Sequence, residues 1–271
     1  MKDTFFSMPR FVNLCRKDMV ESWRSNLLRI ALMYGVMITV LLWTGYFTYA
    51  DKTLLVGDDN VQSFTAVFFM WSLWAFGCLS ASFTMEKMKS KTSRLSTLMT
   101  PATSFEKYFS RWLVFTVAFL AVFLITFWLA DHTRVLVYRL CYPDLKDIAT
   151  APMSYFVGDD TNHFTLFRSA DNFAMVLSLY FFCQSSFVLG STIWPKNAFL
   201  KTFVAGAIIF ITYVLFILWM NDLFNIGATL DRSVDKEMVW IALTIVFSIC
   251  TLFNWTLAYF RFKESEIINR M

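Results

Sequence analysis

Residues 112–130 read WLVFTVAFLAVFLITFWLA, an apolar run without a single Asp, Glu, Lys or Arg. A helix that crosses the hydrocarbon core of a bilayer needs about 20 mostly apolar residues, and a charge at its centre costs about 2.5–3.5 kcal/mol. In lipid the backbone polar groups must pair within the segment, so such a run is expected to be an α-helix. The stretch therefore predicts a membrane-spanning helix.

Five further stretches pass the same test, because none has a charged residue in its central turns. The composition agrees: 16% of the residues are charged, whereas a soluble domain has about a quarter. We predict an all-α, polytopic membrane protein with one transmembrane domain, 1–271. Its predicted spans are 30–49, 63–83, 112–130, 173–193, 203–220 and 239–260.

The distribution of Lys and Arg predicts the orientation of these spans. If the N-terminus lies inside, the inner segments hold 17 of the 24 basic residues and only 7 of the 20 acidic residues. Basic residues favour the cytoplasmic side of a membrane. Both ends of the chain are therefore expected in the cytoplasm, and the location predicted for the protein is the bacterial inner membrane.

The segment 8–27, before the first span, has the pattern of an amphipathic helix. Met8, Val12, Cys15, Met19 and Trp23 recur at helical spacing, and basic side chains fall on the opposite face. A helix of this kind lies in the membrane interface, with its apolar face toward the acyl chains. It predicts either an ordinary anchor or an elbow that moves with the first span.

The inner segment between the second and third spans predicts a short helix, a turn and a long helix. Pro101 breaks the first helix, and Thr103 and Glu106 have the spacing of a capping box that starts the next. Upstream, residues 93–99 are long enough for about two turns, with Leu95, Leu98 and Met99 on one face. The short helix is either a docking element for a soluble partner or a solvated connector.

Residues 98–112, LMTPATSFEKYFSRW, resemble the stretch after the second span in ABC-2-type ABC transporter permeases, particularly those of the Bacteroidetes. Residues 189–202, LGSTIWPKNAFLKT, resemble the fourth-to-fifth inner turn of the same family. Thr103 stands where many members of the family have Ser, which keeps the capping hydroxyl. With the six spans and the N-terminal helix, the resemblance covers nearly the whole chain.

The resemblance implies a permease subunit that pairs as a homodimer or heterodimer above a separate ATPase chain and exports a substrate. It also implies short helices dipping toward the membrane in the outer segment 221–238. The short inner helix would sit in a groove of the ATPase, and the second inner turn would make a smaller contact. The implied coupling residues are Arg94, Leu95, Leu98, Met99, Pro101, Glu106 and Lys107, with Trp194, Pro195 and Lys196 in the second turn.

The sequence contains no loop that could hydrolyse a nucleotide. Residues 89–92, KSKT, have the lysines and hydroxyls of a phosphate-binding loop but none of its glycines. His132 and His163 lie in the predicted outer loop 131–172, and a solvated turn explains Asp159 and Asp160 better than a metal site does. We therefore expect no catalytic residue, metal or cofactor in this chain, and no nucleic acid as a partner.

Uncharged polar side chains remain inside the predicted spans. Gln184, Ser185, Ser186 and Asn254 could line a path for substrate, although hydrogen bonding between helices explains them better. No Asp, Glu or His lies within the spans, which argues against transport driven by an ion gradient.

The alternatives to a permease are a membrane scaffold or assembly factor that transports nothing, and a channel. The predicted outer loop is apolar enough to form one or two short helices.

Overall fold

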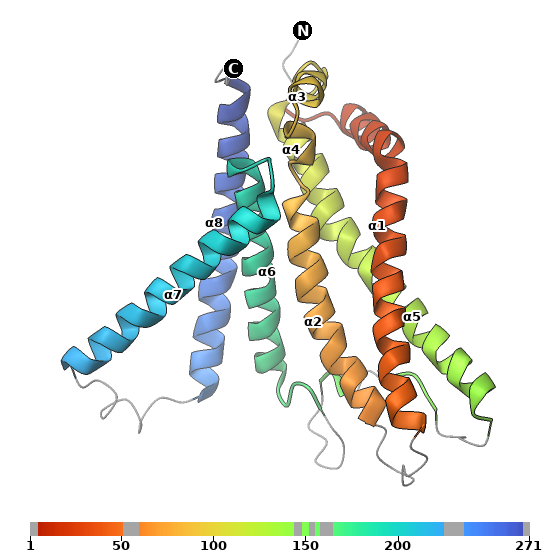
Figure 1. Ribbon diagram of the computed structural model, residues 1–271. Coiled ribbons are helices and arrows are strands. Elements are labelled where there is room, and N and C mark those ends of the chain that lie inside the picture. The colour runs from red at the N-terminus through yellow and green to blue at the C-terminus, as the bar shows by residue number, and fades with distance from the viewer. Residues whose placement is uncertain are drawn as a thin grey trace. The chain divides into compact units, whose positions relative to one another are not determined.

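The structure is a computed structural model that describes residues 5–50, 60–143, 148–151, 155–157, 165–224 and 236–267 (Figure 1). Helices make up nearly all of these residues, and the bridge between Val157 and Phe167 is isolated rather than part of a strand. The elements in chain order are α1 (Met8–Ala50), α2 (Asn60–Ser82), the 3-10 turn η1 (Glu86–Met88), α3 (Lys91–Leu98), α4 (Ser104–Trp112), the π-helical segment η2 (Leu113–Ala118), α5 (Phe119–Cys141), α6 (Ala170–Ile193), α7 (Ala198–Phe224) and α8 (Lys236–Ile267).

Six helical stretches among the described residues are long and apolar enough to cross a membrane, which confirms the all-α, multi-pass prediction. Each overlaps one of the six predicted spans. The third is composite, because α4, η2 and α5 follow one another without a break from Ser104 to Cys141.

The structure corrects several predicted boundaries. The predicted interfacial helix 8–27 and the first span are one helix, α1, which bends near its N-terminal end (Figure 1). The predicted outer loop begins after Cys141 rather than at Asp131, because α5 continues through this apolar sequence as a helix. In the predicted outer segment 221–238, the ends belong to α7 and α8, and residues 225–235 lie outside the described residues.

The chain forms two compact units. Unit 1 consists of Met1–Gly77 and Leu113–Ala170, and therefore contains α1, most of α2 and α5. Its packing centres on Tyr138 of α5, whose hydroxyl donates to the backbone carbonyl of Leu42 in α1. A Cβ atom at Gly45 would lie 2.5 Å from the Tyr138 ring. The close approach of α1 to α5 therefore requires glycine at position 45.

Unit 2 consists of Cys78–Trp112 and Asp171–Met271. It contains the C-terminal turn of α2, the elements η1, α3 and α4, and the helices α6, α7 and α8. We call the end of this unit that carries α3 the α3 end. An apolar cluster joins these elements there, and we call it the inner cluster. The buried members of the inner cluster are Ala81, Met85, Met88, Tyr108, Val188, Ala258 and Phe262.

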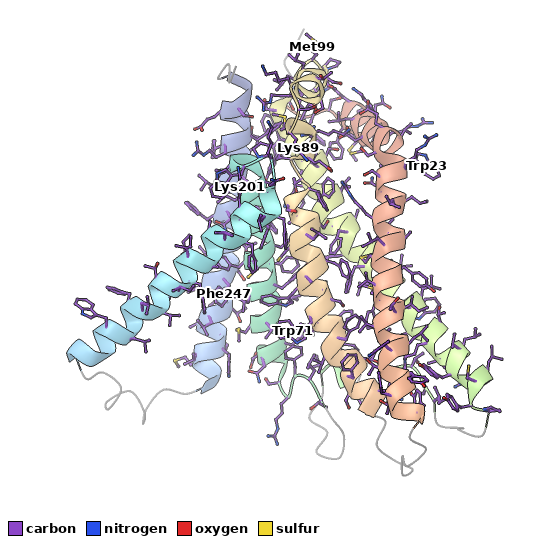
Figure 2. All side chains as sticks on the ribbon, viewed as in Figure 1. Trp23, Trp71, Lys89, Met99, Lys201 and Phe247 are labelled. Atoms are coloured by element: carbon purple, nitrogen blue, oxygen red, sulfur yellow. The ribbon has the colours of Figure 1, made fainter. Side chains whose placement is uncertain are left out.

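The helices α7 and α8 expose apolar side chains over most of their length. Ile209 and Phe210 of α7 are 69% and 68% exposed, and Phe253 of α8 is 65% exposed. Water would penalise such surfaces, whereas lipid chains do not. On α1 the predicted apolar face is exposed as well, and Trp23 projects from it (Figure 2). These surfaces agree with a protein that is embedded in lipid.

Candidate functional site

The helix α3 is the most prominent polar element at the α3 end of unit 2. Its start is fixed by Ser90, whose hydroxyl accepts a hydrogen bond from the backbone N–H of Ser93 at 3.2 Å. The hydroxyl of Ser93 in turn donates to the carbonyl of Lys87 at 2.6 Å. The exposed Lys89 and Lys91 give the start of the helix a positive surface. The predicted short helix is therefore confirmed, with its first turn two residues earlier than expected.

The face of α3 on which Leu95, Leu98 and Met99 were predicted to lie together is divided in the structure. Leu95 is 56% exposed, and Met99, the residue that follows the helix, is 80% exposed and lies at the tip of the unit (Figure 2). Leu98 instead packs against the inner cluster. Leu98 therefore anchors α3, while Leu95 and Met99 form its outer surface.

Two buried cations of α4 hold the C-terminal end of α3. The Lys107 ammonium donates to the Leu98 carbonyl at 3.1 Å, and the Arg111 guanidinium donates to the Thr97 hydroxyl at 3.0 Å. A cation next to the last carbonyls of a helix also interacts favourably with the helix dipole. Because α4 continues through η2 into α5, these contacts join α3 directly to a membrane-spanning segment.

The predicted capping box at the start of α4 is confirmed. The Thr103 backbone N–H donates to a carboxylate oxygen of Glu106 at 3.0 Å, and the Glu106 N–H donates to the Thr103 hydroxyl at 3.3 Å. Pro101 lies exposed in the turn between α3 and α4. Glu106 itself is fully buried. It therefore supports the turn from within and adds nothing to its outer surface.

Replacing Glu106 with alanine is expected to loosen the start of α4 by about 0.5–2 kcal/mol, because a backbone donor loses its partner. Hydrogen exchange of the amides at 103–107 measures this directly and should accelerate. Glu106→Gln keeps an acceptor oxygen and should exchange more slowly than Glu106→Ala. Equal exchange rates in Glu106→Ala and the unmodified chain would contradict the capping role.

The second predicted contact, the turn after α6, lies next to α3. The N–H of Trp194 donates to the Gly190 carbonyl at 2.8 Å, and Lys196 projects as an exposed cation. Pro195 and Arg94 line the same small cavity of about 30 Å³. The Arg94 guanidinium donates to the Met88 carbonyl at 3.1 Å. The structure thus brings the two predicted inner segments together on one surface of unit 2.

The polar residues predicted within the spans form a clamp between α6 and α8. The side-chain amide of Asn254 donates to the hydroxyls of Ser185 and Ser186, at 3.1 and 3.2 Å. This arrangement confirms the prediction of hydrogen bonding between helices for these three residues. Gln184 is different: its amide is fully buried and has no hydrogen-bond partner among the described residues.

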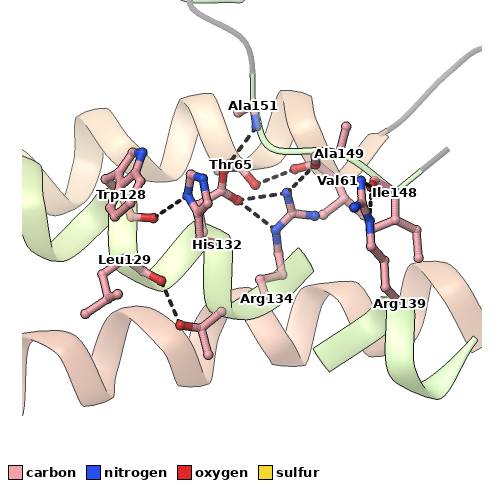
Figure 3. Close-up of polar contacts among 12 residues, drawn as sticks. Val61, Thr65, Trp128, Leu129, His132, Arg134, Arg139, Ile148, Ala149 and Ala151 are labelled. Carbon is pink, nitrogen blue, oxygen red and sulfur yellow. Dashed lines mark hydrogen bonds and ion pairs between the residues drawn. The ribbon is translucent and has the colours of Figure 1, made fainter. Parts of the chain in front are cut away.

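Unit 1 contains a buried ion pair that the sequence does not predict. Arg134 and Asp131 lie one turn apart in α5, and their nearest charged atoms are 2.8 Å apart (Figure 3). Arg134 also donates to the Tyr49 hydroxyl at 3.2 Å and to the Ala149 carbonyl at 2.9 Å, while Asp131 accepts from the N–H of Ala151 at 3.1 Å. Two opposite charges three residues apart are the signal that the sequence offers, but both residues fall in the predicted outer loop 131–172.

No family model, no curated protein and no solved structure matches the chain. The resemblance to ABC-2-type permeases therefore rests on the two inner segments and the number of spans.

Proposed function

We propose that the chain is the membrane-spanning subunit of an ABC-2-type transporter, and that a separate ATPase chain binds it at α3. The observation that carries the proposal is the construction of α3. It presents Leu95 and Met99 outward at the tip of unit 2, while Lys107 and Arg111 tie it to the segment that crosses the membrane. A solvated connector needs neither the exposed apolar pair nor the buried attachments.

The attachments suggest how movement of an ATPase would reach the membrane. A force on Leu95 and Met99 would pass through α3 to the Leu98 carbonyl and the Thr97 hydroxyl, and from there to Lys107 and Arg111 of α4. The second turn, with Pro195 and Lys196, would give the ATPase a smaller contact beside α3. In this proposal the subunits pair as a homodimer or heterodimer in the bacterial inner membrane, and the chain ends and α3 face the cytoplasm.

The double variant Leu95→Asp/Met99→Asp is expected to reduce co-purification with the proposed ATPase chain, sought among the products of neighbouring genes, by at least about tenfold. Two carboxylates in an apolar groove would lose hydration without gaining partners. Both positions are exposed, so the variant should reach the membrane in normal amount. The earlier candidate position Leu98 is unsuitable, because a change there would also disturb the inner cluster.

A matched control is Lys263→Asp, which changes the net charge by the same amount at an exposed position of α8. It should leave co-purification unchanged. The proposal would be ruled out if the unmodified chain did not associate with the ATPase, or if the double variant associated fully. Association without nucleotide-dependent flux in vesicles would instead identify a scaffold or assembly factor.

A further inference from the structure

Several hydrogen-bonding groups inside unit 2 are buried without a hydrogen-bond partner among the described residues. Among them are the side-chain nitrogen and oxygen of Gln184 and the indole N–H groups of Trp112 and Trp255, which lie in helices that meet at the inner cluster. Polar groups buried in proteins are nearly always paired, and each unpaired group in hydrocarbon costs several kcal/mol. A molecule that is not part of this chain is therefore expected to complete these hydrogen bonds.

The contacts of unit 2 place these groups in one region. Trp112 and Trp255 meet edge to face, with ring centroids 5.0 Å apart, and both pack against the inner cluster. Val188 belongs to that cluster and lies one helical turn from Gln184 on the same face of α6. Ser185 of α6 follows Gln184 in sequence, and Asn254 of α8 precedes Trp255. Because the Asn254 amide donates a hydrogen bond to the Ser185 hydroxyl, Gln184 and Trp255 lie at a similar height along these two helices.

The available groups are three donor nitrogens and one acceptor oxygen. The edge-to-face contact can turn only one indole N–H toward the other ring, which would be a weak substitute for a hydrogen bond. Donors in this excess match a ligand with several acceptor oxygens and one hydroxyl. The nearest cations in sequence, Lys107 and Arg111, already bind Leu98 and Thr97 of the chain. An uncharged ligand fits this set better than a phosphate.

We propose that Gln184, Trp112 and Trp255 form an intramembrane binding site for the neutral, oxygen-bearing head of an amphipathic molecule, of the kind that carries a hydroxyl and ester carbonyls. The Gln184 carbonyl accepts from the hydroxyl of the ligand. The Gln184 amide nitrogen and the indole N–H groups donate to its oxygens. That this ligand is the transported substrate rests on the proposed function, whereas its binding does not.

The test uses the full chain in phosphatidylcholine nanodiscs, with dioleoylglycerol as the probe and dioleoylphosphatidylglycerol as the charged comparison. Dioleoylglycerol offers one hydroxyl and two ester carbonyls. A few mole per cent of it is expected to raise the Tm of the unmodified chain by about 2–4 °C, because a ligand that binds only the folded state stabilises it. The charged lipid should give no such rise.

Three variants assign the effect to the site. Gln184→Leu and Trp255→Phe keep most of the packing volume, remove the hydrogen-bonding groups and should abolish the rise. Trp128→Phe, at a 60% exposed position of α5, should keep it. As a second measurement, dioleoylglycerol with brominated acyl chains should quench less tryptophan fluorescence in Trp255→Phe than in Trp128→Phe.

Two results would overturn the site: no rise in the unmodified chain, as expected if water alone fills the region, or an equal rise in Gln184→Leu. The assay contains no ATPase. A chain that binds the neutral lipid but no ATPase would keep the site and lose the proposed transporter function. A chain that binds the ATPase but not the neutral lipid would keep the proposed transporter function and lose the site.

Discussion

Replacing Arg134 with leucine is expected to destabilise unit 1 by about 3–5 kcal/mol, the cost of leaving a buried charge without its partner. Arg134 is fully buried, and Asp131 is 5% exposed. The substitution would leave the Asp131 carboxylate with the Ala151 N–H and would remove the donors to the Tyr49 hydroxyl and the Ala149 carbonyl. Thermal unfolding in detergent, followed with a thiol-reactive dye, measures the loss.

Two comparisons separate the buried charge from other effects of the substitution. The double variant Asp131→Leu/Arg134→Leu removes both charges and should recover much of the lost stability. Arg139→Leu removes an exposed arginine of the same helix, which donates to the Ile148 carbonyl at 2.9 Å, and should cost about 1 kcal/mol or less. A loss below about 1 kcal/mol in Arg134→Leu would show that the ion pair does not hold this end of unit 1 together.

Replacing Gly190 with valine is expected to disrupt the junction of α6 and α7. A Cβ atom at Gly190 would lie 1.9 Å from the Thr202 hydroxyl oxygen and 2.8 Å from the Thr202 Cβ atom. Overpacking of this kind costs about 1–3 kcal/mol and often shifts the backbone. The shift would move the turn that holds Pro195, so the variant should lower both the Tm and the binding of the proposed ATPase.

Gly206 provides a matched control for this prediction. It lies in α7, and a Cβ atom there would meet nothing within 4 Å. Gly206→Val should therefore unfold at the same temperature as the unmodified chain. The smaller substitution Gly190→Ala adds the Cβ atom alone and should also destabilise the chain. Because Thr202→Ala removes the two atoms nearest to that Cβ, combining it with Gly190→Ala should restore part of the lost stability. Equal stabilities of Gly190→Val and Gly206→Val would contradict the close contact seen in the structure.

The Asp131–Arg134 ion pair and the contact between Gly190 and Thr202 are features that could not be predicted from the sequence. Asp131 and Arg134 read as a charged loop after an apolar run, because a span of standard length ends near Ala130. In the structure α5 continues through them, and the contacts with Tyr49 and Ala149 come from distant parts of the chain. Gly190 carries no local signal at all, since its requirement comes from Thr202 on the next helix.

The proposed ATPase-binding segment, α3 with the turn that leads into α4, could be predicted in part from the sequence. The break at Pro101 and the capping box of Thr103 and Glu106 follow from neighbours within a few residues, and both appear as predicted. Helical spacing placed Leu95, Leu98 and Met99 on one face. It could not tell which part of that face meets the inner cluster, so Leu98 was assigned to the surface when it serves as an anchor.

The sequence by itself determined that the chain is an all-α membrane protein with six spans, and where its short inner helix and capping box lie. Lipid permits only long apolar helices, and helix ends are set by residues close in sequence, so these features can be read locally. Only the tertiary structure decided which side of α3 is exposed, how Arg134 is paired, why Gly190 is required and which polar groups of unit 2 are buried without a hydrogen-bond partner among the described residues. Each depends on side chains brought together from separate helices, and the spacing of residues along one helix does not specify its neighbours.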